Sequence, residues 1–218
     1  VVKHSWRGRY RRILCIAASG VVTLDPTTLA VTNSYDFAAD FDRAAPDPNG
    51  AAEFSLSVRS DGKGKFKAMR FSSPLRAGIL TELHRLRPVH PVVEFPVLHL
   101  RRRTQEWAPF KIKVTSLGIE LLEVHSGNLR WCLDFRDMDS PAILLLGDNY
   151  GRRSAEGGGF VLCPLYGRKS KAFMAASGST NTLIISSLTK TAKSAIGLSL
   201  SIDNSQSMTA ADFIARRG

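Results

Sequence analysis

The sequence is poor in cysteine, with three among 218 residues, at Cys15, Cys132 and Cys163. The three are far apart, odd in number and form no CxxC pair, which argues against a disulfide framework and indicates a reducing compartment. Long apolar runs are also missing, since the longest lies near residues 142–146, and none is long enough to span a bilayer. The chain begins with Val1, and no signal-peptide pattern follows. We therefore expect a piece of a longer cytoplasmic chain.

The residue patterns that bind metals or carry catalysis are scarce as well. The five histidines do not combine with the cysteines at the spacing that zinc requires. Each cysteine lies in an apolar run, where a buried and unreactive thiol is the common case. The sequence therefore predicts a protein without catalytic activity, metal or cofactor.

Acidic residues are in deficit, because 19 Asp and Glu face 30 Lys and Arg, which gives a net charge of +11. Such a charge predicts an anionic partner, which could be nucleic acid, a phosphoinositide membrane or an acidic protein. The bases cluster at residues 3–12 and 63–70, whereas residues 25–61 are mainly acidic. One positive face favours a local anionic ligand over a nucleic-acid backbone, so we expect no nucleic-acid partner.

The first half of the chain reads as strands followed by one helix. Runs of β-branched and aromatic residues, with apolar and polar residues alternating at 53–59, predict strands between residues 9 and 71. Ser73 and Pro74 then mark a helix start. Its apolar face is predicted from residues at spacings of four, four and three, namely Leu75, Ile79, Leu83 and Leu86.

The second half repeats this plan after a linker marked by Pro88 and Pro91. Strands are predicted between residues 95 and 175, and a helix at 181–196 ends at Gly197. The apolar face of this second helix is predicted to comprise Ile184, Leu188, Ala192 and Ala195.

The predicted fold is therefore mainly β with C-terminal helices. We expect two tandem pleckstrin-homology-like barrels, each capped by one α-helix: a phosphoinositide-binding domain at 1–88, and a structural or protein-binding domain at 95–203. Residues 204–218 are expected to start a following helical region, because Asp212 comes three residues after Thr209 in a capping pattern.

The opening stretch HSWRGRYRR, residues 4–12, places four arginines among two aromatic side chains and a glycine. As a single strand, residues 3–12 would extend roughly 30 Å, with Trp6, Tyr10 and Arg12 on one face. Two readings remain open. Trp6 and Tyr10 are buried core residues beside a solvated edge, or a bend at Gly8 lets the basic end curl around a phosphate with Trp6 at the rim.

Several motifs resemble the receptor-mediated-endocytosis-8 family, also called DnaJ homologue subfamily C member 13, which comprises large endosomal J-domain co-chaperones. The resemblance lies in KHSWRGRYRR at 3–12 and LAVTN at 29–33. It continues, towards the plant branch, in FPVLHLRRR at 95–103 and WCLDFRD at 131–137. It implies the N-terminal region of such a protein, peripheral on the endosomal membrane, where the family binds phosphatidylinositol 3-phosphate.

The resemblance also implies the binding residues, because the family's lipid-binding motif falls on Lys3, Trp6, Tyr10 and Arg12. Arg9 is the best addition by charge. The family's J-domain is absent from these residues, so an Hsp70 partner is expected only through that absent domain, and sorting proteins are further expected partners. Two functions stay open: a membrane-targeting module that reads a phosphoinositide, and a protein-interaction scaffold without direct lipid binding.

Overall fold

The computed structural model describes residues 1–59, 64–87, 92–147, 159–165 and 168–215, and the proline pair predicted as a linker lies outside these residues. The chain folds into two compact units. The first contains the described residues up to Arg87 together with Ser194–Gly197, and the second contains those from Val92 to Lys193 and from Leu198 onward.

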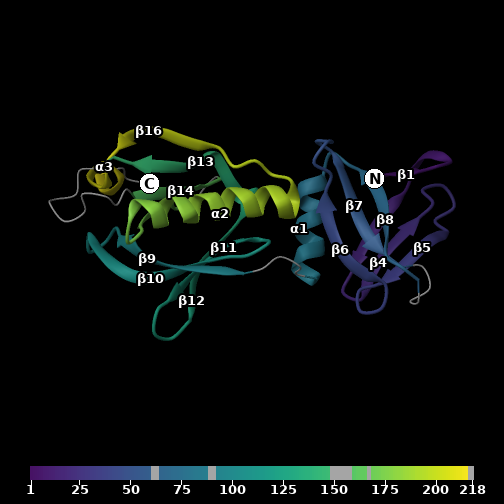
Figure 1. Ribbon diagram of the computed structural model, residues 1–218, viewed down its shortest axis with the longest axis horizontal. Helices are drawn as coiled ribbons and strands as arrows, with labels where there is room; N and C mark the ends of the chain where they lie inside the picture. The colour runs from purple at the N-terminus through teal and green to yellow at the C-terminus, as the bar shows by residue number, and fades with distance from the viewer. Residues whose placement is uncertain (60–63, 88–91, 148–158, 166–167, 216–218) are drawn as a thin grey trace. The chain divides into compact units, whose positions relative to one another are not determined.

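The first unit consists of two antiparallel sheets and one helix (Figure 1). The five-stranded sheet has the order β2 (Gly8–Arg11), β1 (Val2–Ser5), β8 (Lys67–Ser72), β7 (Glu53–Val58) and β6 (Phe41–Pro46). The three-stranded sheet has the order β3 (Ile13–Ala17), β4 (Gly20–Leu24) and β5 (Val31–Asp36). Phe54 and Phe71 stack in the core with ring centroids 5.6 Å apart.

Helix α1 (Arg76–Leu86) lies in the predicted place, but only part of its predicted apolar face is buried. It begins two residues after Pro74. Of that face Leu83 is buried and Ile79 half-buried, whereas Leu75 and Leu86 are exposed. Leu80, Thr81 and His84 are buried in addition. The two polar side chains are tolerated there because each bonds a backbone carbonyl oxygen at 2.8 Å.

The second unit consists of one eight-stranded sheet with helices (Figure 1). Its strand order is β12 (Leu129–Asp134), β11 (Gly118–Glu123), β10 (Glu106–Val114), β9 (Val93–Arg101), β15 (Lys171–Met174), β14 (Gly159–Pro164), β13 (Met138–Leu146) and β16 (Ile202–Met208). Neighbouring strands are antiparallel except β13 and β16, which are parallel. A 3-10 turn, Phe135–Asp137, links β12 to β13.

Helix α2 (Gly178–Ile196) runs alongside this sheet (Figure 1) and confirms the predicted second helix. Its predicted apolar face is fully buried. Gly197 follows the helix with a φ of +73°, a conformation that glycine adopts without strain.

The mainly β class with C-terminal helices is confirmed, but the closed barrels are not. In the described pairings each sheet is open, with edge strands β2 and β6, β3 and β5, and β12 and β16. Residues 204–208, predicted to begin a helical region, complete β16 instead. The predicted helix after it, α3 (Ala210–Ala215), is present, with Thr209 and Asp212 capping each other's backbone N–H groups.

Candidate functional site

The opening basic stretch folds as a β-hairpin and not as one extended strand. Strands β1 and β2 pair with Lys3 opposite Tyr10 and Ser5 opposite Gly8. Trp6 and the residue after it form the turn, and Gly8 has a φ of +124°, which residues with a Cβ rarely adopt. The single-strand prediction is therefore wrong, because the turn returns Tyr10 to the side of Lys3.

Three of the predicted site residues share one face of this hairpin. Lys3 and Tyr10 do so because directly opposed residues of an antiparallel pair project to the same side. Arg12 is two residues beyond Tyr10, and the central carbon of its guanidinium lies 5.5 Å from the centre of the tyrosine ring. We call Lys3, Tyr10 and Arg12 the hairpin cluster.

The other two predicted residues lie apart from this cluster. Trp6 is at the tip of the hairpin with 88% of its surface exposed, and the Arg7 guanidinium carbon lies 4.7 Å from the centre of its ring. Arg9 lies opposite His4, on the other face of the hairpin. Tyr10 is 37% exposed, so the reading in which Trp6 and Tyr10 are core residues is wrong.

The hairpin cluster contains two cations that repel one another. Burial, and then the charge of Arg12, lower the pKa of Lys3 below its ordinary value. Arg12 donates through Nη1 to the carbonyl oxygen of Arg11 at 2.6 Å and to Oδ2 of Asp25 at 3.4 Å. Its Nε is buried and has no hydrogen-bond partner among the described residues. An oxyanion bound here would offset the repulsion between Lys3 and Arg12 and could accept a hydrogen bond from Arg12.

Asp25 is the member of this site that the sequence did not reveal. In the sequence it is only the first residue of the acidic range 25–61, and in the structure its Oδ1 accepts bonds from the N–H groups of Thr27 and Thr28, at 3.0 and 3.2 Å. These two bonds are the largest cause of a pKa below the ordinary aspartate value. The carboxylate therefore stays charged and forms a partly exposed ion pair with Arg12.

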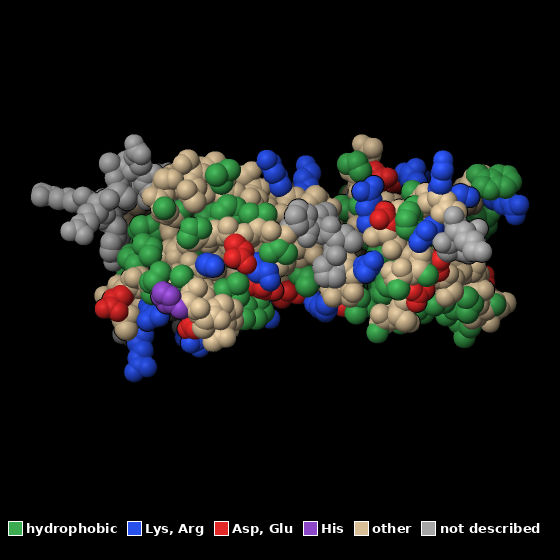
Figure 2. Space-filling model, turned by 60° about the horizontal axis from the view of Figure 1, so that its bottom comes forward, with side chains coloured by type: hydrophobic (Ala, Val, Ile, Leu, Met, Phe, Trp, Pro, Cys, Tyr) green, Lys and Arg blue, Asp and Glu red, His purple; other side chains and the backbone are tan. Residues whose placement is uncertain are grey.

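The positive charge of the second basic cluster, residues 63–70, is partly neutralised by acidic side chains. Lys63 lies outside the described residues, and Arg70 pairs with Asp47 and Glu53, both at 3.1 Å. Figure 2 likewise shows acidic side chains among the basic ones on the visible face of each unit. The positive face expected from the sequence is thus less uniform than the clustering of bases suggests.

The cysteines do not occupy the positions expected of them. Cys15 and Cys132 are exposed and Cys163 is half-buried, so the prediction that all three are buried is wrong. No group of three or more His, Cys, Asp or Glu side chains within the described ranges is arranged to hold a metal ion. No helix in the same ranges combines the length and the apolarity needed to cross a membrane.

Comparison with known proteins gives two matches. Residues 1–89 match the family model described as the DNAJ protein RME-8 N-terminal domain. The whole chain is similar to DnaJ homolog subfamily C GRV2 of Arabidopsis thaliana, with 62% identity over 226 residues. The match covers 100% of the chain but only 9% of that relative, at its N-terminal end. The chain therefore belongs to the RME-8 family of DnaJ proteins and represents the N-terminal region of its plant type.

Proposed function

We propose that the first unit is a non-catalytic membrane-targeting module that binds phosphatidylinositol 3-phosphate on endosomes. The observation that carries the proposal is the hairpin itself, in which Lys3, Tyr10 and Arg12 share a face and Trp6 projects at the tip. The choice of the 3-phosphate isomer rests on the family resemblance.

The phosphate is held by charge and by hydrogen bonds. A phosphate placed between Lys3 and Arg12 would neutralise two cations that otherwise repel each other. The guanidinium can offer two parallel N–H groups to phosphate oxygens, whereas the lysine acts as a mobile point charge. The phosphate competes with Asp25 for Arg12, but a partly exposed ion pair at 3.4 Å contributes little stability and yields readily.

The indole of Trp6 supplies the second element of membrane binding. Its ring is amphipathic, and such rings favour the boundary between lipid headgroups and acyl chains. Headgroup binding and indole insertion together give a reversible, peripheral attachment, as two weak membrane signals commonly do. In the proposal the protein is cytoplasmic and only its first unit contacts the endosomal surface.

For the whole protein, this module would position a co-chaperone for endosomal trafficking. The J-domain expected of the family lies outside these residues and would recruit Hsp70 there. Sorting proteins are the proposed further partners, and the second unit is proposed to be structural or to bind protein.

A protein-interaction scaffold is the second candidate, and one observation favours it. Ile13, Leu24 and Val31 are directly opposed on neighbouring strands of the three-stranded sheet. Ile13 is 39% and Val31 63% exposed. Such a row of apolar side chains is typical of a surface that another protein covers.

Vesicle binding separates the two candidates. The 218-residue chain is titrated with vesicles that contain phosphatidylserine and either phosphatidylinositol or its 3-phosphate. We expect binding that requires the phosphorylated lipid and falls about tenfold or more in K3A, since bonds to charged groups contribute about 1.5–3 kcal/mol. Lys67→Ala, which removes an exposed lysine from β8, is the charge-matched control and should bind like the unsubstituted chain.

Equal binding to both vesicle types, or equal losses in K3A and K67A, would show only general attraction between a basic protein and an anionic surface. Absence of binding to either vesicle type would favour the scaffold.

A further inference from the structure

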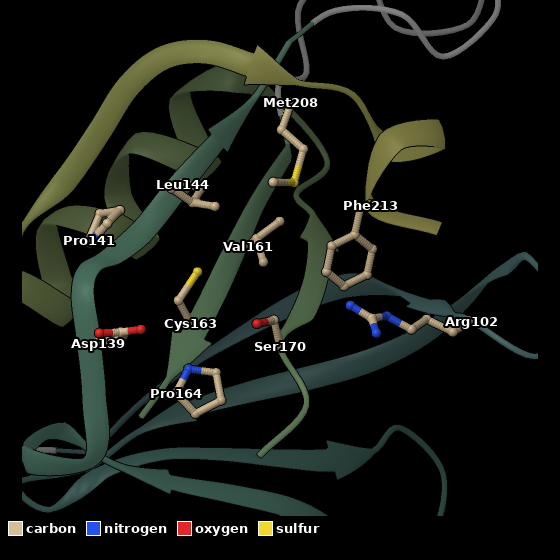
Figure 3. Close-up of a pocket in the computed structure, with 10 residues that line it drawn as sticks. All are labelled: Arg102, Asp139, Pro141, Leu144, Val161, Cys163, Pro164, Ser170, Met208 and Phe213. Atoms are coloured by element: carbon tan, nitrogen blue, oxygen red, sulfur yellow. The ribbon is translucent and has the colours of Figure 1, made fainter. Parts of the chain in front are cut away.

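The second unit contains a pocket of about 440 Å³ on one face of its sheet (Figure 3). Its walls come from β13, β14, the end of β16 and α3, with Arg102 at the rim. The volume lies at the lower end of the range for ligand pockets, which is roughly 300–1,000 Å³. The first unit contributes no residue to it.

Most of the pocket wall is apolar. Leu144, Val161, Met208 and Phe213 line it, and three of these also belong to a buried cluster that joins α3 to the sheet. Val161 faces the pocket because its neighbours Phe160 and Leu162 project to the opposite side of β14, where both are fully buried. This part of the pocket is fixed by the core of the unit and suits an apolar group.

One end of the pocket carries the positive charge of Arg102, for which no ion pair is formed with the acidic side chains of the described residues. The guanidinium carbon of Arg102 lies 4.2 Å from the centre of the Phe213 ring, and Figure 3 shows the arginine below this ring. The Nε of Arg102 is buried and has no hydrogen-bond partner in the described part of the chain. An arginine stacked on an aromatic face keeps the planar fork that binds a carboxylate or phosphate with two bonds.

Lys171 lies on the other face of the sheet, because it is directly opposed to Leu162, which projects away from the pocket. Its ammonium lies 5.5 Å from the centre of the Trp131 ring. Burial, followed by the charge of Arg102, lowers the pKa of Lys171. Among the described lining residues Arg102 is therefore the one cation, and an anionic ligand would balance its charge.

The far end of the pocket is acidic. Figure 3 shows Asp139 across the pocket from Arg102, beside Pro141 and Pro164. A headgroup with several phosphates would be repelled by this carboxylate, whereas the N–H groups of a peptide could donate to it. The mixture of a cationic end, an apolar wall and a single carboxylate therefore fits a peptide better than a phospholipid.

We propose that this pocket binds a short segment of a partner protein in which an acidic side chain is next to a large aliphatic one. The acidic side chain pairs with Arg102, and the aliphatic side chain fills the space between Leu144, Val161 and Met208. The proposal concerns the second unit and does not depend on lipid binding by the first.

A thiol in the pocket wall provides the test. Cys163 lines the pocket and is half-buried, whereas Cys15 and Cys132 are exposed elsewhere and serve as internal references. The 218-residue chain is treated with N-ethylmaleimide, and the rate at each cysteine is followed by peptide mass spectrometry. The probe is the capped peptide acetyl-Leu-Glu-Leu-Glu-Leu-amide.

We expect the probe to slow alkylation of Cys163 at least about threefold and to leave the two references unchanged. Replacing its glutamates by glutamine should raise the peptide concentration needed for half-maximal protection about tenfold, since a bond to a charged group is lost. Replacing its leucines by serine should also remove protection. Arg102→Met should abolish the effect, and Arg103→Met, an exposed neighbour with the same charge change, should retain it.

Three results would overturn the proposal. The first is that the peptide at millimolar concentration does not slow the alkylation of Cys163 in the unsubstituted chain. This result can be interpreted without any variant. The second is equal protection by the glutamine peptide, which would mean a purely apolar site. The third is equal protection by inorganic phosphate or by soluble phosphoinositide headgroup, which would mean a small-anion site and not a peptide site.

Discussion

The exposed indole at the hairpin tip allows lipid binding to be separated from folding. Trp6 is 88% exposed, so a change to alanine should alter the free energy of unfolding by less than about 0.5 kcal/mol. Of the roughly 250 Å² of a tryptophan side chain, about half the exposed part would enter the lipid interface. At about 25 cal/mol per Å², this insertion contributes about 3 kcal/mol, or about a hundredfold in affinity.

The assay compares W6A with the unsubstituted chain on vesicles containing phosphatidylinositol 3-phosphate, and thermal unfolding is followed in parallel. The melting temperature should change by no more than about 2 °C. Leu75→Ala removes another exposed apolar side chain of the same unit, 71% exposed, and should leave vesicle affinity unchanged. Affinity of W6A within threefold of the unsubstituted chain, with both proteins folded, would show that the tip does not insert.

Three further outcomes follow from individual residues. Arg12→Ala should weaken vesicle binding and also lower stability by up to about 1 kcal/mol, because it removes the partner of Asp25; an unchanged affinity would remove Arg12 from the site. Gly20→Ala should lower the stability of the first unit by about 1–3 kcal/mol in a denaturant titration, since a Cβ there would overlap the carbonyl oxygen of Tyr35. His99 has a pKa lowered to about 4, first by burial and then by Lys171. The unfolded chain therefore takes up a proton at this histidine at a higher pH than the folded chain does. The free energy of unfolding should fall as the pH is lowered from 6.5 to 4, by about 1–2 kcal/mol after allowance for solvent screening. The H99Q variant should show a flatter pH dependence.

The opening stretch shows what sequence pattern could and could not predict there. Residue types and family motif pointed to Lys3, Tyr10 and Arg12, and these do lie together. The strand parity was assigned on the assumption of a continuous strand, and a two-residue turn breaks that assumption. The reading with a bend at Gly8 was nearer to the structure, because a glycine just after a turn commonly has a positive φ.

The two helices differ in how far an apolar pattern determines the buried face. In α2 the predicted residues are all fully buried, because nearby polar positions do not compete with them. In α1 Leu83 of the predicted face is buried, but Leu80 and His84, each one position along from a predicted residue, are buried as well. The burial of His84 depends on a backbone carbonyl oxygen that bonds its ring nitrogen. Only tertiary structure shows such a partner.

The order of the strands in the sheets could not be predicted from local sequence pattern. Alternation locates most strands, but closure into a barrel depends on pairing between strands that are distant in sequence. Strand β16 pairs in parallel with β13, with Ile202 beside Ile143. No hairpin turn joins these two strands, so the sequence contains no local signal for their pairing. Arg102 and Phe213 are likewise brought together only by this pairing and the short helix that follows it.

The position of β2 at the edge of its sheet has a consequence for the solution behaviour of the protein. All four of its residues, Gly8–Arg11, are exposed, and its outer backbone groups would pair readily with another strand. Arg9 and Arg11 place two like charges along this edge, and a second copy approaching it would meet the same charges. We therefore expect Arg9 and Arg11 to oppose pairing of this edge with a second copy of the chain. Neutralising both should raise the tendency to self-associate even where lipid binding is unchanged.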